Sequence, residues 1–208
     1  MSLFRLLSGL VVVLLVSCAA VAGRSDAGLD ESLQEGWNTW RVTSNDAYRK
    51  SCCYRWSMGK RTQKTCDVDA PVTAVSTTQE AASERIEIQV YARIESGRAS
   101  RILMLSPQCP AQALSPINDL GLIAAESSIA WLQTYVLSSE DVAEQALGAI
   151  AGHSGGVRQL IVVAEDQRLP MVMRERALFW MAQSNSDDAF DYVAMLLSRR
   201  DTGARGLY

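Results

Sequence analysis

The sequence of 208 residues has few of the residues from which catalytic sites are built. Its one histidine, His153, stands in the segment Gly152-His153-Ser154-Gly155-Gly156, which is typical of a turn after a helix. A histidine that acts as a general base needs a nucleophile or a carboxylate held beside it. The sequence also has no glycine-rich phosphate loop and no nucleophile-elbow pattern. We therefore expect no catalytic residue and a protein that is not an enzyme, with His153 suited to a helix C-terminus.

Long apolar runs are also scarce, and none is long enough to cross a bilayer. The most apolar stretch, residues 6–16, follows a basic residue and precedes the small-residue motif Ala20-Val21-Ala22. This order predicts a signal peptide over residues 1–22, cleaved near Ala22. An alternative stays open, because Leu15-Val16-Ser17-Cys18 resembles a bacterial lipobox, which would make Cys18 a lipidated N-terminus. Both interpretations predict an exported protein of the periplasm or cell envelope, in contact with a membrane only through that lipid anchor.

Cysteine is sparse but informative in an exported chain. Without Cys18, four cysteines remain: Cys52, Cys53, Cys66 and Cys109. An even number in an oxidising compartment indicates two disulfides, for which three pairings exist. We favour one bond that closes the Cys52–Cys66 region and one that reaches Cys109, since a bond between adjacent cysteines strains the peptide. The alternative is a four-thiolate zinc site, but the sequence lacks Cys-x-x-Cys, and its ligands would have to stay reduced after export. We expect no metal and no cofactor.

The formal net charge of −3 argues against nucleic acid as a general partner. Positive charge is nevertheless concentrated between residues 41 and 66, which contain seven basic residues and one acidic residue. The candidates for anion binding are Arg49, Lys50, Arg55, Lys60, Arg61 and Lys64. Aromatic residues are interleaved with them, which is typical of a surface where rings stack and cations pair with anionic groups. The alternative, which we favour, is that the aromatic residues cover a small disulfide core while the charges face solvent.

The first half of the mature chain is predicted to be a leader followed by a β module. Residues 23–36 are polar, and residues 37–110 contain the four cysteines. Within residues 86–106, two stretches flank a glycine-containing turn, and the first alternates apolar and polar residues. This pattern predicts a β-hairpin with one buried face. Residues 107–123, which contain prolines and no clear period, are interpreted as irregular.

Helical periodicity dominates residues 124–200. After a first helix at 124–136, apolar residues recur at i, i+4, i+7 and i+8 from Val142 onward. We expect two antiparallel helix pairs, at 138–166 and 170–200, and a tail at 201–208.

The two helix pairs can be aligned on each other at an offset of 31 to 32 residues. A helix–turn–helix period in this range is typical of a solenoid. The run Arg176-Ala177-Leu178-Phe179-Trp180-Met181-Ala182-Gln183, followed by Asp187-Asp188-Ala189, resembles a bacterial HEAT-like repeat. The whole chain is similar to small exported bacterial HEAT-repeat proteins with a cysteine-bearing N-terminal region. The resemblance implies a scaffold that binds other proteins.

These observations together predict an α+β chain, with a disulfide-linked β-hairpin module followed by a short HEAT-like α-solenoid of about five helices. The predicted function is that of an exported, non-enzymatic adaptor that binds another cell-envelope protein through its helical surface. The candidate residues for that surface are Phe190, Tyr192, Met195 and Trp180. We favour a core position for Trp180, with an exposed ridge as the alternative. The alternative function is binding of an anionic envelope polymer or lipid surface through residues 37–66.

Overall fold

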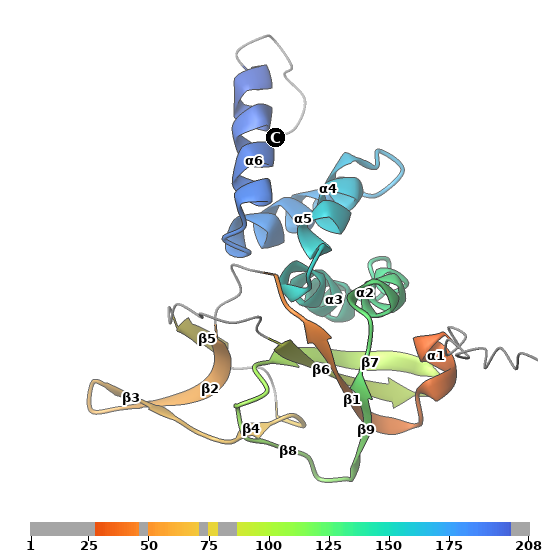
Figure 1. Ribbon diagram of the computed structural model, residues 1–208, viewed down its shortest axis with the longest axis vertical. Helices are drawn as coiled ribbons and strands as arrows, with labels where there is room; N and C mark the ends of the chain where they lie inside the picture. The colour runs from red at the N-terminus through yellow and green to blue at the C-terminus, as the bar shows by residue number, and fades with distance from the viewer. Residues whose placement is uncertain (1–27, 46–49, 71–74, 79–86, 201–208) are drawn as a thin grey trace, which may run out of the picture.

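The computed structural model describes residues 28–45, 50–70, 75–78 and 87–200 (Figure 1). The predicted signal peptide, Cys18 and the predicted tail at 201–208 lie outside the described residues.

The centre of the fold is a four-stranded sheet with the strand order β7-β6-β1-β9. Its strands are β1 (Gly36–Thr43), β6 (Glu87–Glu95), β7 (Arg98–Leu105) and β9 (Ile117–Leu122). Strand β1 pairs antiparallel with β6 and parallel with β9, and β6 and β7 form a hairpin. The turn of this hairpin uses Ser96 and Gly97 at positive φ, as a tight two-residue connection requires.

Both faces of the sheet are covered, because side chains along each strand alternate between the faces. Trp40, Val42 and Val90 pack into the larger apolar cluster, which the helices complete. Trp37 and Tyr91 pack into a second cluster, which contains the cysteines. The two tryptophans stand three residues apart, so they point to opposite faces, and each is at most 1% exposed.

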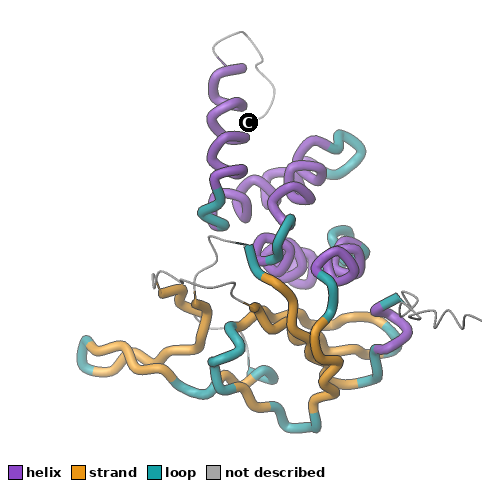
Figure 2. The backbone as a smooth tube through the Cα atoms, in the orientation of Figure 1, coloured by secondary structure: helices purple, strands orange, loops and turns teal. Residues whose placement is uncertain are grey.

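The described residues form six helices. Their bounds are α1 Leu29–Ser32, α2 Ala125–Gln133, α3 Glu140–Gly152, α4 Gly156–Glu165, α5 Met171–Gln183 and α6 Asp187–Arg200. Helices α2 and α3 lie on the sheet, and α4, α5 and α6 extend away from it (Figure 2). Leu132, Leu147 and Ile150, which are fully buried, join the helices to the same cluster as Trp40.

Shorter strands form the disulfide-linked part of the chain. Strands β2 (Lys50–Ser57), β3 (Lys60–Gln63) and β5 (Val75–Thr78) make a sheet of order β3-β2-β5, and β4 (Cys66–Asp67) pairs with β8 (Ala111–Gln112). Strands β2 and β3 are joined by a two-residue turn at Met58 and Gly59, which have φ angles of 50° and 74°. Two consecutive positive φ angles give the turn the twist that matches the flanking strands.

The predicted fold class, a β-hairpin module followed by a HEAT-like α-solenoid, is wrong. A helix does occur at each predicted stretch, but α2 and α3 bury their apolar faces on the sheet rather than in a stack of repeats. The hairpin of β6 and β7 is extended by β1 and by β9, whose residues were interpreted as irregular. Helical periodicity reports which face of a helix is buried, but it does not report what covers that face.

Candidate functional site

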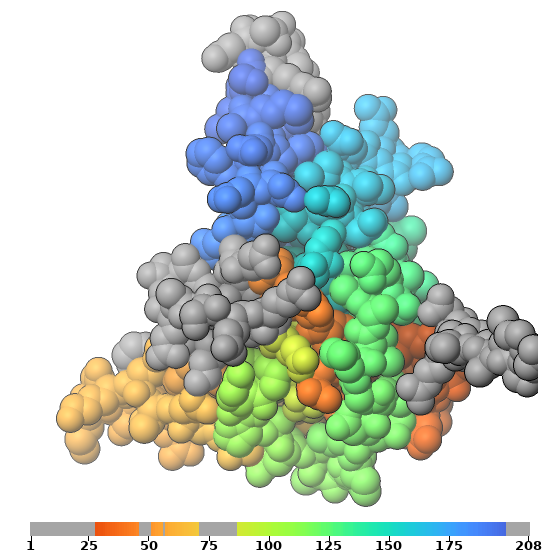
Figure 3. Space-filling view, viewed as in Figure 1, coloured from red at the N-terminus to blue at the C-terminus, as the bar shows by residue number. Residues whose placement is uncertain are grey.

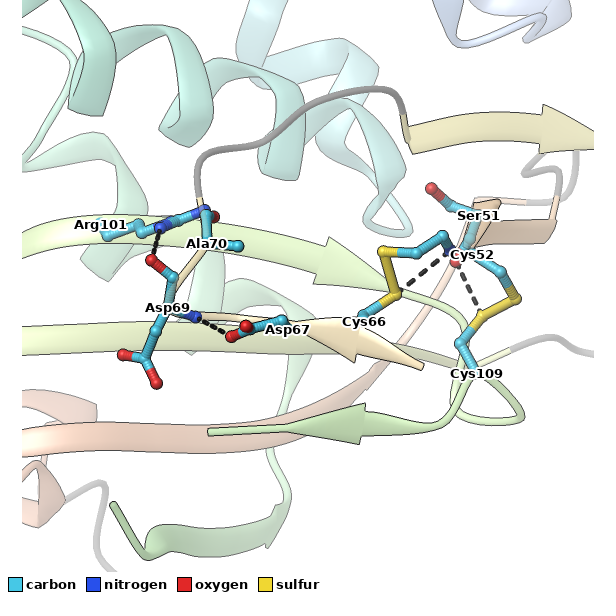
Figure 4. The surroundings of a disulfide bond; sticks show 9 residues. Ser51, Cys52, Cys66, Asp67, Asp69, Ala70, Arg101 and Cys109 are labelled. Atoms are coloured by element: carbon cyan, nitrogen blue, oxygen red, sulfur yellow. Dashed lines mark hydrogen bonds between the residues drawn. A yellow bond between two sulfur atoms is a disulfide. The ribbon is translucent and has the colours of Figure 1, made fainter. Parts of the chain in front are cut away.

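Two disulfides hold the base of the β2–β3 hairpin. Cys52 is bonded to Cys109, in the loop after β7, and Cys53 is bonded to Cys66, in β4 (Figure 4). Adjacent strand residues point to opposite faces, so the two bonds anchor β2 from both sides. The predicted disulfides are thereby confirmed, and they indicate an oxidising, exported location. Across the described ranges, no cluster of histidine, cysteine or acidic residues could hold a metal ion.

Beyond this base, the hairpin carries most of the predicted anion-binding residues. We call residues 50–64 the basic hairpin. It has five basic residues and no acidic one. Arg55, Lys60, Arg61 and Lys64 are exposed, and the Arg61 guanidinium lies 4.3 Å from the centre of the Tyr54 ring. The hairpin projects from the body of the molecule (Figure 3).

The side chains of two of the predicted anion-binding residues are not described by the structure. Arg49 lies outside the described residues, and Lys50 is placed in β2 without a described side chain. Met58, at the turn, is fully exposed. The hairpin therefore presents an apolar tip, with cationic side chains behind it.

Asp69 attaches the segment after β4 to the central sheet. Its Oδ1 atom accepts hydrogen bonds from Trp37 Nε1 at 2.8 Å and from Arg93 at 3.3 Å, and its Oδ2 atom accepts one from the backbone N–H of Leu114 at 2.6 Å. The Arg101 guanidinium donates to the carbonyls of Asp69 and Ala70 (Figure 4). The hydrogen bonds from Leu114 and Trp37 lower the pKa of Asp69, and the nearby positive charges of Arg93 and Arg101 add to this effect. This arrangement is a structural anchor.

His153 belongs to a second network, which is buried between the sheet and the helices. Trp40 Nε1 donates to Ser128 Oγ at 2.8 Å, and Ser128 Oγ lies 2.8 Å from His153 Nε2. His153 Nδ1 lies 2.7 Å from the carbonyl oxygen of Ala149. One arrangement satisfies every group: Nδ1–H donates to Ala149, and Nε2 accepts the Ser128 hydroxyl proton. Burial lowers the pKa of His153 to about 4, so the imidazole is neutral at pH 7.

A serine hydroxyl directed at a histidine has the geometry of a nucleophile and its base. Here both side chains are completely inaccessible to solvent, and the serine oxygen already accepts the Trp40 N–H. A substrate has no route to this hydroxyl in the described fold. The network therefore connects β1, α2 and α3 rather than forming a reactive pair.

The predicted partner-binding residues do not form one continuous surface. Phe190 on α6 is 74% exposed, whereas Tyr192 and Met195 are half-buried, and the Tyr192 hydroxyl donates to Glu165 at 3.3 Å. Trp180 is half-buried, and its Nε1 donates to Glu144 of α3 at 2.8 Å. The structure thus places Phe190 outward and turns Trp180 towards α3.

Comparison of the chain with protein-family models, with curated proteins and with solved structures finds no match. Among the described residues, no helix is both long enough and apolar enough to cross a membrane.

The sequence pattern predicts neither the Asp69 network nor the buried network of Ser128 and His153. Asp69 falls within the predicted β module of residues 37–110, and Ser128 falls within the predicted helix at 124–136. Their partners are remote in the chain: Trp37 is 32 residues from Asp69, and Trp40 is 88 residues from Ser128. No local pattern marks such a pair.

Proposed function

We propose that this chain is an exported, non-enzymatic scaffold that binds another cell-envelope protein through its outer helices. The signal peptide of residues 1–22, or lipidation at Cys18, would deliver it to the periplasm or cell envelope. The observation that carries the proposal is an exposed apolar strip on α6. Phe190 is 74% exposed and Leu197 is 52% exposed. They are seven positions apart, which is about two turns, so they lie on the same side of the helix.

The packing of α6 supports this role. Ala189 is buried, so α6 uses one side to contact the rest of the protein and leaves the side of Phe190 outward. Helix α5, which α6 contacts, is tied to α3 by ion pairs from Arg176 to Glu140 and Glu144. An exposed aromatic side chain on an anchored layer is typical of a protein-binding surface.

The test is a crosslinking pull-down of the protein from its native envelope at low and high salt. A discrete partner should survive high salt, because apolar contacts are not screened. Phe190→Arg should abolish its capture. The matched control is Leu122→Arg on β9, where Leu122 is 61% exposed, and it should capture the partner as the wild type does. Equal capture by Phe190→Arg would exclude this surface.

A second candidate function is binding of an anionic envelope polymer or lipid surface through the basic hairpin. It is supported by the absence of acidic residues between 50 and 64 and by the projection of the hairpin (Figure 3). This function predicts retention on an anionic matrix that falls with salt. The Lys60→Gln, Arg61→Gln, Lys64→Gln variant should elute earlier than the wild type, and equal elution would count against it.

A further inference from the structure

The basic hairpin carries a residue that neither its turn nor its packing explains. Met58 has a φ angle of 50°, in the left-handed region that non-glycine residues adopt at a cost. Asparagine and glycine are the residues preferred at this position of such a turn. The Met58 side chain is also fully exposed, so no contact within the described protein offsets the cost of its backbone conformation.

The rest of the hairpin is built to hold this tip away from the body. A two-stranded ribbon is marginally stable on its own. Here the disulfides at Cys52 and Cys53 fix its base from two sides, and the four residues of β3 are all exposed. The tip can therefore contact a surface outside the protein while the base of the hairpin stays attached to the fold.

The cationic side chains are set back from the tip by a short distance. Lys60 and Arg61 follow the turn directly, so they lie within roughly 7 Å of it along the strand. Apolar groups of interfacial segments are buried about 5–10 Å into the boundary between headgroups and acyl chains, while Lys and Arg remain at the level of the phosphates. The spacing of Met58 and the cations matches these two levels.

We propose that the basic hairpin is a membrane-docking element that inserts Met58 into the surface of an anionic phospholipid bilayer, with Lys60 and Arg61 at the lipid phosphates. Arg55 and Lys64 lie further from the tip and add to the attraction to the anionic surface. This proposal rests on the second candidate function and specifies its ligand. A soluble polyanion would bind the cations equally well, but it would gain nothing from an apolar tip. The exposed methionine is therefore what distinguishes the two ligands.

The test is co-flotation of the oxidised protein with vesicles of equal parts phosphatidylcholine and phosphatidylglycerol, and with vesicles of phosphatidylcholine alone. The wild type should float with the anionic vesicles only. Met58→Asn should weaken binding on the order of tenfold, because a methionine side chain no longer leaves water. Lys60→Gln, Arg61→Gln, Lys64→Gln should weaken it on the order of a hundredfold, since each cation near an anionic surface contributes roughly a fivefold effect.

Matched controls separate the tip from general surface properties. Leu114→Asn removes an equally exposed apolar residue elsewhere, and Arg98→Gln, Arg158→Gln, Arg168→Gln removes three other exposed cations. Both controls should bind vesicles as the wild type does. Met58→Asn places a residue suited to positive φ at the turn, so its unfolding midpoint should be no lower than that of the wild type.

The outcomes are distinguishable. If Met58→Asn floats with the anionic vesicles as well as the wild type does, the proposed insertion of Met58 is overturned. If the cation variant still loses binding, and if polyphosphate displaces the wild type from the vesicles, the ligand is a polyanion in general and the second candidate function stands. If neither vesicles nor polyphosphate bind the wild type, both the insertion and that candidate function are overturned.

Discussion

The Nε2 atom of His153 lies 2.8 Å from the Oγ atom of Ser128, and neither side chain is accessible to solvent. The histidine follows the last residue of α3, and the serine comes from α2. Through the Trp40 indole, the pair also reaches β1. One neutral imidazole therefore joins three elements at the point where the helices meet the sheet.

The stability of the protein should depend on pH through His153. Burial lowers its folded-state pKa from 6.5 to about 4, so the unfolded chain takes up a proton at a pH at which the folded chain does not. The stabilisation is complete above pH 6.5 and is lost as the pH falls towards 4. Protonation of His153 in the unfolded chain should by itself make the free energy of unfolding about 2 kcal/mol lower at pH 5 than at pH 7. Urea denaturation at several pH values measures this difference.

The control for that experiment is His153→Gln. The chain has one histidine, so this variant removes the only imidazole that titrates in the range. It should be less stable than the wild type at pH 7, and its stability should change much less between pH 7 and pH 5. An unchanged pH dependence in His153→Gln would show that other groups cause the effect.

Ser128→Ala should destabilise the fold by about 2–4 kcal/mol, because it leaves the Trp40 N–H and the His153 Nε2 atom buried without partners. Chemical denaturation of the variant tests this expectation. Ser127→Ala, at the neighbouring half-buried position of α2, is the control and should change stability by less than about 0.5 kcal/mol. Equal stabilities of the two variants would mean that the network contributes little.

Asp69→Asn should lower the free energy of unfolding by roughly 1–3 kcal/mol, since the neutral amide cannot serve all the donors that meet the carboxylate. The pKa of Asp69 is lowered in the folded state, so its contribution is present above pH 3.8 and is lost as the pH falls below that value. Urea titrations at neutral and acidic pH measure both effects. Asp67→Asn, which changes a more exposed carboxylate two residues away, should have a smaller effect.

The two disulfides should differ in their contributions. Cys52–Cys109 spans 57 residues and Cys53–Cys66 spans 13. Replacing the first pair by alanine should cost roughly 4 kcal/mol and the second roughly 3 kcal/mol, because the longer loop gains more freedom in the unfolded chain. Denaturant midpoints of the two double variants test this order, and a larger loss for the Cys53–Cys66 pair would contradict it.

Gly148→Ala should destabilise the protein by roughly 1–3 kcal/mol, although the same change in an open helix stabilises it. A methyl group at Gly148 would stand 2.9 Å from the Trp180 ring, which packs α5 against α3. In a Trp180→Leu background the cost should fall, because the ring is gone. A double-mutant cycle measures this coupling, and strictly additive effects would show that the contact does not limit the approach of the helices.

The sequence anticipated the elements better than their arrangement. The hairpin of β6 and β7 and the helices between 124 and 200 occur where alternation and helical periodicity predict them. The sequence does not predict the central position of β1. Because this strand is buried on both faces, its residues lack the alternation of apolar and polar side chains that marks a half-buried strand. Strand β9 was missed for a different reason: its six residues contain Asn118, Asp119 and Gly121, which are depleted in strands.

The helices between residues 124 and 200, the β6–β7 hairpin and the cysteines that form disulfides follow from the sequence alone, since they depend on neighbouring residues and on composition. Helix α1, within the predicted polar leader, does not. The packing of α2 and α3 on a sheet, and the pairing of the cysteines, depend on the tertiary structure. It alone brought Ser128 to His153 and Asp69 to Trp37. These relationships join residues that are 13 to 88 positions apart, and they form because packing and buried hydrogen bonds offset the entropy of closing long loops.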